Sequence, residues 1–103
     1  KHRVHRAITG AEPRAFELRG TNWFPRPAPD GDGDAEAQWR ADVQLLKRWH
    51  ARLMAAVDAL DADGLSKPSG GGHTVAEHLL GVAAHDVYHA GQIQLLKRLH
   101  AGG

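Results

Sequence analysis

The sequence predicts an all-α fold, and three observations support this prediction. Apolar residues recur at helical spacing over two long segments, residues 34–60 and 73–100. No stretch alternates apolar and polar residues with the period of two that marks a β-strand. Segments rich in glycine and proline separate the helical ones. Two long helices and a helical stub do not complete a helix bundle, which normally has four helices.

The composition is typical of one soluble globular domain. The chain has 103 residues, of which 42% are hydrophobic and 24% are charged, and we expect a single domain over residues 1–103. The net charge of +1 lacks the basic excess of nucleic-acid-binding domains. No apolar run approaches the roughly 18–20 residues that cross a bilayer. We therefore expect neither a nucleic acid nor a membrane as a partner.

Two further absences restrict the chemistry and the location. The chain contains no cysteine, so any metal must be held by nitrogen and oxygen ligands. The first ten residues, KHRVHRAITG, contain no apolar core of a signal peptide. A cytoplasmic location is therefore the expectation.

The N-terminal third consists of a short helix and a long connection. Residues 1–8 resemble the last turns of a helix, and Gly10 is placed to end it. Four prolines lie between Ala11 and Gly33, which predicts an irregular segment. Trp23 and Phe24 within it are expected to pack against another part of the protein, either as ordinary loop packing or as a lid over a site.

The first long helix is predicted between Asp34, as N-cap, and Gly64, which lies beyond its end. Apolar residues and one histidine recur there at alternating spacings of four and three, which indicates one buried helix face. The members of this face are Trp39, Val43, Leu46, His50, Leu53, Val57 and Leu60.

The second long helix is predicted from about His73 to His100, after the turn SKPSGGG. Thr74 and Glu77 have the Thr-x-x-Glu spacing of a capping box at its start. Lys97 and Arg98 lie in the last turns, where positive charge interacts favourably with the helix dipole.

The stretch GVAAHDVYHAGQI places His85 and His89 four residues apart. Eight histidines in a chain of this length produce about 0.6 such pairs by chance, so the spacing alone is weak evidence. At about 100° per residue, His78, His85 and His89 share a face with apolar residues that we expect to be buried. Imidazoles one turn apart can converge on one cation, or each can be a structural histidine bonded to its surroundings.

A metal held by His85 and His89 needs at least a third ligand. Within the chain the best-placed candidate is His50, although a buried or half-buried bundle histidine without a metal is the more ordinary role for it. His2 and His5 are further candidates, each also explained as part of a basic helix end. Asp86 and His89 have the spacing of a di-iron motif, but the other predicted helix offers no facing carboxylates, so a di-iron site is not expected.

The stretch GVAAHDVYHAGQIQLLKRL resembles the closing helix of the DinB/DfsB-like superfamily of damage-inducible and related proteins, with its His-x-x-x-His followed by Gly-Gln-Ile. The upstream pieces KHRVHRAITG, NWFPRP and W…LLKRWHARLMAAVDAL are similar to the end of the family's second helix, the next loop and its third helix. The resemblance implies an up-and-down four-helix bundle whose first helix, and most of whose second, precede Lys1. The chain would then be a single DinB-like domain, truncated at its N-terminus.

The resemblance also implies a function. In the family a divalent metal is held by three histidines, of which two correspond to His85 and His89 and the third would lie before Lys1. Histidine ligation fits zinc, nickel, iron or copper, and zinc or nickel is the expected metal. Characterised relatives use low-molecular-weight thiols such as mycothiol or bacillithiol, so a metal-dependent S-transferase or hydrolase acting on a small molecule is expected.

Several details of that function stay open at the level of sequence. No catalytic residue is assigned, and Gln92 is expected to orient a ligand or a bound water. Asp86 and Tyr88 flank the histidine pair, so they would either position the metal ligands or contribute to a homodimer contact. The alternative function is a metal-free helical module for interaction or dimerisation.

Overall fold

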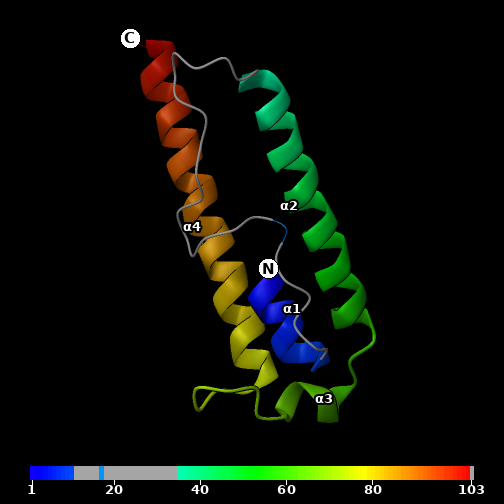
Figure 1. Ribbon diagram of the computed structural model, residues 1–103. Helices are drawn as coiled ribbons and strands as arrows, with labels where there is room; N and C mark the ends of the chain where they lie inside the picture. Colours follow the sequence, from blue (N-terminus) through cyan, green and yellow to red (C-terminus); the bar gives the residue numbers. More distant parts are fainter. Residues whose placement is uncertain (11–16, 18–34, 103) are drawn as a thin grey trace. The chain divides into compact units, whose positions relative to one another are not determined.

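The computed structural model describes residues 1–10, 17 and 35–102, and this part of the chain is helical (Figure 1). Its helices are α1 (His2–Thr9), α2 (Ala35–Asp58), α3 (Ala62–Ser66) and α4 (Val75–Gly102). The described residues contain no strand, only an isolated bridge between Pro68 and Thr74. The predicted all-α fold class is therefore confirmed. The chain divides into two compact units, Lys1–Ala59 and Leu60–Gly103, which we describe in turn.

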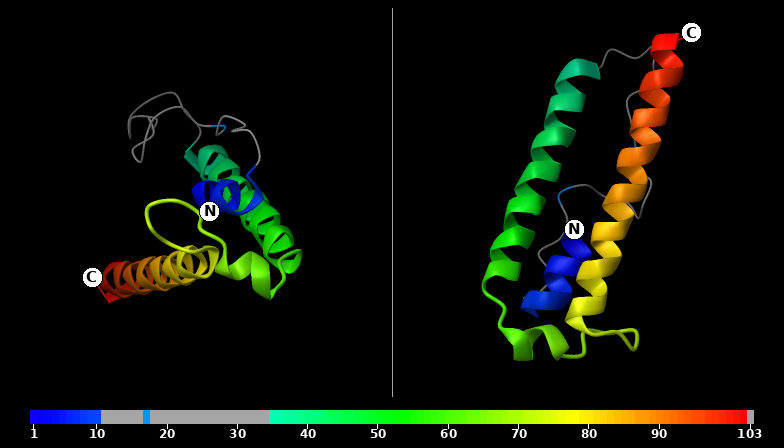
Figure 2. Two further views of the ribbon diagram at one scale, coloured as in Figure 1. Left: turned by 90° about the horizontal axis from the view of Figure 1, so that it is seen from below. Right: turned by 180° about the vertical axis from the view of Figure 1, so that it is seen from behind.

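The first unit pairs α1 with the C-terminal half of α2 (Figures 1 and 2). Gly10 ends α1 in the left-handed conformation, at φ 61°, and its N–H donates to the carbonyl of Arg6 at 3.0 Å. Glycine adopts this conformation without the steric cost that a Cβ imposes. The prediction that residues 1–8 are helical and that Gly10 stops the helix is confirmed, whereas the proposed cap of α2, Asp34, lies outside the described residues.

The buried face of α2 differs from the predicted one. Leu45, Trp49 and Leu53 are buried, whereas Trp39 and Leu46 are 64% and 57% exposed. Leu53 thus belongs to both the predicted and the observed face. The other two buried residues, Leu45 and Trp49, each lie one position before a residue of the predicted face. The sequence allowed either choice because Leu45 and Leu46 are adjacent and equally apolar. Contact with α1 decides between them, because the α1 side chains meet the Trp49 ring.

The second unit begins with the five-residue helix α3, which the sequence analysis did not predict. Asp61 caps this helix, and its Oδ1 accepts a hydrogen bond of 2.7 Å from the N–H of Gly64. Gly64 lies beyond the end of α2, as predicted, and is buried within α3. A Cβ at Gly64 would lie 3.0 Å from Leu60 Cδ2, so this position favours glycine. A single capped turn has no apolar period, and this explains why the sequence pattern did not predict α3.

The glycine run between α3 and α4 forms a tight turn. Gly70, Gly71 and Gly72 all have positive φ, of 101°, 62° and 77°. The N–H of Ser69 donates to the carbonyl of His73 at 2.9 Å, which closes the turn. Three successive positive φ angles require glycine, so the run is explained by backbone geometry.

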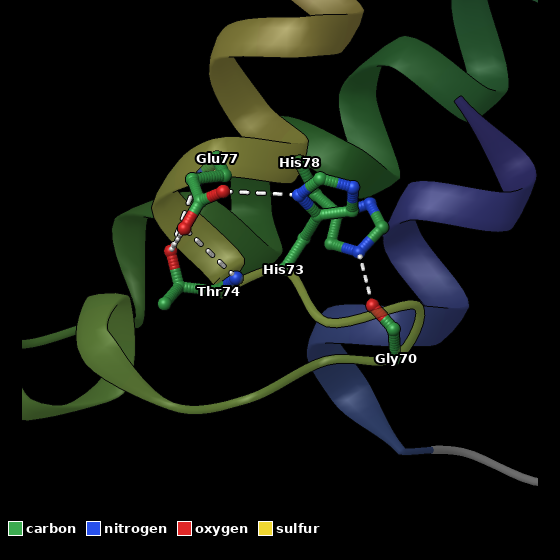
Figure 3. A network of polar contacts seen from close by, with 5 residues as sticks. All are labelled: Gly70, His73, Thr74, Glu77 and His78. Atoms are coloured by element: carbon green, nitrogen blue, oxygen red, sulfur yellow. Dashed lines mark hydrogen bonds and ion pairs between the residues drawn. The ribbon is translucent and has the colours of Figure 1, made fainter.

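Helix α4 begins with the predicted capping box (Figure 3). The N–H of Glu77 donates to Thr74 Oγ1 at 3.2 Å, and the N–H of Thr74 donates to Glu77 Oε1 at 3.5 Å. His73 Nδ1 lies 3.0 Å from the other carboxylate oxygen of Glu77. These contacts lower the pKa of the Glu77 carboxyl below its ordinary value, and the contact with His73 contributes most. The box fixes the first turn of α4.

Beyond its first turns α4 is exposed. Val75 is the one residue of this helix that is buried, and α4 extends well past α3 and the turn (Figure 2). We expected the histidine face to be buried, and this expectation is wrong for His85 and His89, which are exposed. The cause is that α3 and the glycine turn reach only the N-terminal end of α4. The exposed large apolar residues of α4 are Leu80, Val87, Tyr88, Ile93, Leu95, Leu96 and Leu99.

None of the described helices has the combination of length and apolar character that a membrane span requires.

Candidate metal centre

His85 and His89 point toward each other on the exposed surface of α4. Their Nε2 atoms are 3.0 Å apart, and the ring planes meet at 81° with centroids 4.3 Å apart. The convergence follows from the helix, because side chains at i and i+4 lie one turn apart on the same face. The predicted juxtaposition of the two imidazoles is thus present in the structure.

The separation of the two nitrogens fits a shared cation. Two ligand nitrogens, each about 2.0–2.1 Å from one metal ion, lie about 2.8–3.4 Å apart for ligand angles between octahedral and tetrahedral values. The 3.0 Å between the Nε2 atoms falls within that range. Neutral imidazoles are also ligands that suit zinc, nickel and copper. The separation of the two nitrogens is therefore compatible with a divalent cation shared by the pair.

A chain of hydrogen bonds extends from the pair. His89 Nδ1 lies 2.7 Å from Gln92 Oε1, and the Gln92 amide N–H donates to the Tyr88 hydroxyl at 3.4 Å. The Tyr88 ring meets the His89 ring edge to face, with centroids 5.5 Å apart. We expected Gln92 to orient a ligand or a bound water, and in the structure its contact is with His89 itself.

In either unit, no group of three histidine, aspartate or glutamate side chains that could hold a metal is present among the residues that the structure describes. His50, the in-chain candidate for a third ligand, is exposed on α2 in the other unit, which contradicts its expected place on a buried stripe. Asp86 is exposed and shares the surface of α4 with the pair.

The remaining histidines of the sequence analysis have structural contacts. The rings of His2 and His5 meet the Trp49 ring edge to face, at centroid distances of 4.5 and 5.6 Å, so they help to join α1 to α2. His78 is half-buried, and its Nε2 lies 3.3 Å from the carbonyl oxygen of Gly70 (Figure 3). His78 is therefore a structural histidine bonded to the backbone.

Trp49 is the centre of a second polar cluster, which the sequence analysis missed. Its indole N–H donates to Glu17 Oε2 at 2.9 Å, and Arg52 lies over the indole at 4.6 Å from the ring centroid. Arg52 also approaches the Glu17 carboxylate, at 3.6 Å. The hydrogen bond from Trp49 is the main cause of the lowered pKa of Glu17. Glu17 is 32 residues from Trp49, so no local spacing could have indicated this contact.

The lid residues suggested by the sequence, Trp23 and Phe24, lie outside the described residues. Comparisons of the chain with protein-family models, with curated proteins and with solved structures give no match. The His85–His89 pair and its hydrogen-bonded neighbours are therefore the basis for the functional proposal.

Proposed function

We propose that the protein is a metal-dependent member of the DinB/DfsB-like superfamily, in which His85 and His89 are two of the ligands of a divalent cation. The observation that supports this proposal is the 3.0 Å separation of their Nε2 atoms. The spacing of the pair, followed by Gly91, Gln92 and Ile93, is the part of the sequence that resembles the family. Zinc or nickel is the metal that we propose.

The proposed reaction belongs to the class of thiol-dependent transfers or hydrolyses. A cation held by neutral imidazoles, with a position left open, makes a bound water or thiol a nucleophile near neutral pH. In this chain His85 and His89 would hold the cation, and Gln92 and Tyr88 would support His89 from behind. A low-molecular-weight thiol, such as mycothiol or bacillithiol, is the proposed co-substrate.

The proposed bundle has a third histidine ligand, which the family resemblance assigns to a position before Lys1. His50 on α2 is the alternative within this chain. The two possibilities differ in a measurable way, because substitution of His50 lowers metal affinity only if its imidazole is a ligand.

The test is a metal titration of chelator-treated protein with Zn²⁺ and Ni²⁺, followed by competition with a chromophoric indicator. Replacement of His85 or His89 by alanine is expected to lower the affinity at least about tenfold, since even partners that only orient a ligand change affinity 10–100-fold. His100→Ala is the matched control, because His100 is another exposed histidine of α4. Equal binding by the wild-type protein and both pair variants would contradict the proposal.

The alternative function, a metal-free helical module for interaction or dimerisation, is favoured by one observation. Ile93, Leu96 and Leu99 are each more than half exposed, and buried apolar surface is the main driving force of association. Sedimentation with and without chelator separates the two functions. Association that is unaffected by chelator and by His89→Ala, in a protein that binds no metal, would favour the interaction module.

A further inference from the structure

The hydrogen bond between His89 and Gln92 determines which nitrogen of His89 carries the proton. The Oε1 atom of an amide only accepts hydrogen bonds, so the Nδ1 atom at 2.7 Å must be the donor. In a neutral imidazole one nitrogen carries hydrogen and the other has a lone pair. With hydrogen on Nδ1, the Nε2 atom of His89 has the lone pair, and this is the nitrogen that faces His85.

The same reasoning assigns the proton of His85. The two Nε2 atoms are 3.0 Å apart, a hydrogen-bond distance, and one of them must donate. Because Nε2 of His89 accepts, Nε2 of His85 carries the hydrogen in the cation-free protein. This hydrogen-bond arrangement corresponds to opposite tautomers of the two neutral histidines. His89 is already prepared to bind a cation through Nε2, whereas His85 must transfer its proton to Nδ1, through solvent, before it can do so.

The position of Gln92 is itself restricted. Its amide nitrogen lies 3.4 Å from the Tyr88 hydroxyl, which is the contact on the side of the amide away from His89. Tyr88 also limits the rotation of the His89 ring through their edge-to-face contact. Gln92 follows His89 by three residues and Tyr88 by four, so α4 alone brings its amide to both side chains.

We propose that Gln92 is a positioning residue that holds His89 in the Nδ1–H tautomer, with Tyr88 restraining the Gln92 amide, so that Nε2 of His89 is preset for a cation. This inference rests on the proposed function, because a preset Nε2 has a use only if the pair binds a cation. Gln92 acts through His89 and does not touch the metal. A partner of this kind fixes ring orientation and raises the basicity of the ligand.

The test measures the tautomer directly, in the absence of metal. Protein labelled with ¹⁵N in its histidines is freed of metal by chelator and examined by long-range ¹H–¹⁵N NMR at a pH where the rings are neutral. The His89 signals are assigned by their loss in His89→Ala. The wild-type protein is expected to show hydrogen on Nδ1 of His89 and on Nε2 of His85.

Substitutions then separate the contribution of Gln92. Gln92→Leu removes the acceptor, and His89 is expected to become a mixture of tautomers, while Gln92→Glu, which retains an acceptor, should preserve the Nδ1–H form. Gln94→Leu is the matched control, because Gln94 is exposed on α4 two residues away. In a Ni²⁺ titration, Gln92→Leu should lower affinity about 10–100-fold, and Gln92→Glu should restore it. Far-UV circular dichroism of each variant checks that α4 is intact.

The outcomes distinguish this inference from the proposed function. If wild-type protein binds Ni²⁺ but the His89 tautomer and the affinity are the same in Gln92→Leu, the inference is overturned and the metal site stands. If His89 in wild-type protein has its hydrogen on Nε2, the inference is overturned as well. If wild-type protein binds no Ni²⁺, the proposed function fails, and the positioning role of Gln92 fails with it.

Discussion

Substitution of Thr74 by alanine should destabilise the second unit through loss of the cap of α4. The change removes the Oγ1 atom that accepts the Glu77 N–H at 3.2 Å and that also donates to the Glu77 carboxylate. Loss of such a cap costs about 0.5–2 kcal/mol. Glu77 is exposed, so water can replace the lost acceptor, and we expect about 1 kcal/mol, the middle of that range.

The assay for Thr74→Ala is urea unfolding followed by far-UV circular dichroism. With an m value of about 1.5 kcal/mol per M, a loss of about 1 kcal/mol lowers the midpoint by about 0.7 M. The control is Ser66→Ala, since the Ser66 hydroxyl donates to the carbonyl of Ala62, at 3.4 Å, at the C-terminal end of α3. Its expected effect is below about 0.5 kcal/mol. Equal midpoints for wild type and Thr74→Ala, or equal losses in the two variants, would refute the capping argument.

Two further predictions concern the same end of α4. Gly71→Ala should destabilise the protein by about 1–2 kcal/mol, because alanine at φ 62° is in the unfavourable left-handed conformation. Gly91→Ala, in the middle of α4, should be neutral or stabilising. Thermal unfolding measures both variants, and a Gly71→Ala variant as stable as wild type would contradict the assignment of the turn. The lowered pKa of Glu77 gives a pH dependence. A carboxyl whose pKa is lower in the folded protein than in the unfolded chain stabilises the fold at pH values above its unfolded pKa. This stabilisation is lost as the pH falls through the folded pKa. Stability should therefore decline as the pH falls through the lowered pKa of Glu77. The decline should be less steep in Glu77→Gln, and parallel pH profiles would argue against this origin.

The elements predicted best from the sequence are those with a local signature. Gly10 ends α1, and Thr74 with Glu77 starts α4, as their spacing predicts. The convergence of His85 and His89 was predictable for the same reason, because a helix fixes the distance between residues i and i+4. In each of these cases, residues within one or two helical turns determine the geometry.

The features that the sequence did not reveal depend on contacts between distant residues or on choices between equal neighbours. The face of α2 that contains Leu45 and Trp49 is selected by α1, which lies far away in the chain. The contact of Glu17 with Trp49 has no local signal at all. The exposure of His85 and His89 was mispredicted because an apolar period indicates what a helix is suited to bury and not whether a partner covers it.

The exposed half of α4 makes the histidine pair depend on the helix in a particular way. Among the described residues, few tertiary contacts support this segment. Its helical content there rests on the intrinsic preferences of its leucines, alanines and long polar residues, and an isolated helix of this kind is only marginally favourable. Unwinding of one turn would separate the Nε2 atoms of His85 and His89, which meet only in the helical state. A cation bound by both rings would therefore stabilise the helical state, by linkage. In thermodynamic terms, folding of this turn and assembly of the ligand pair would be a single equilibrium.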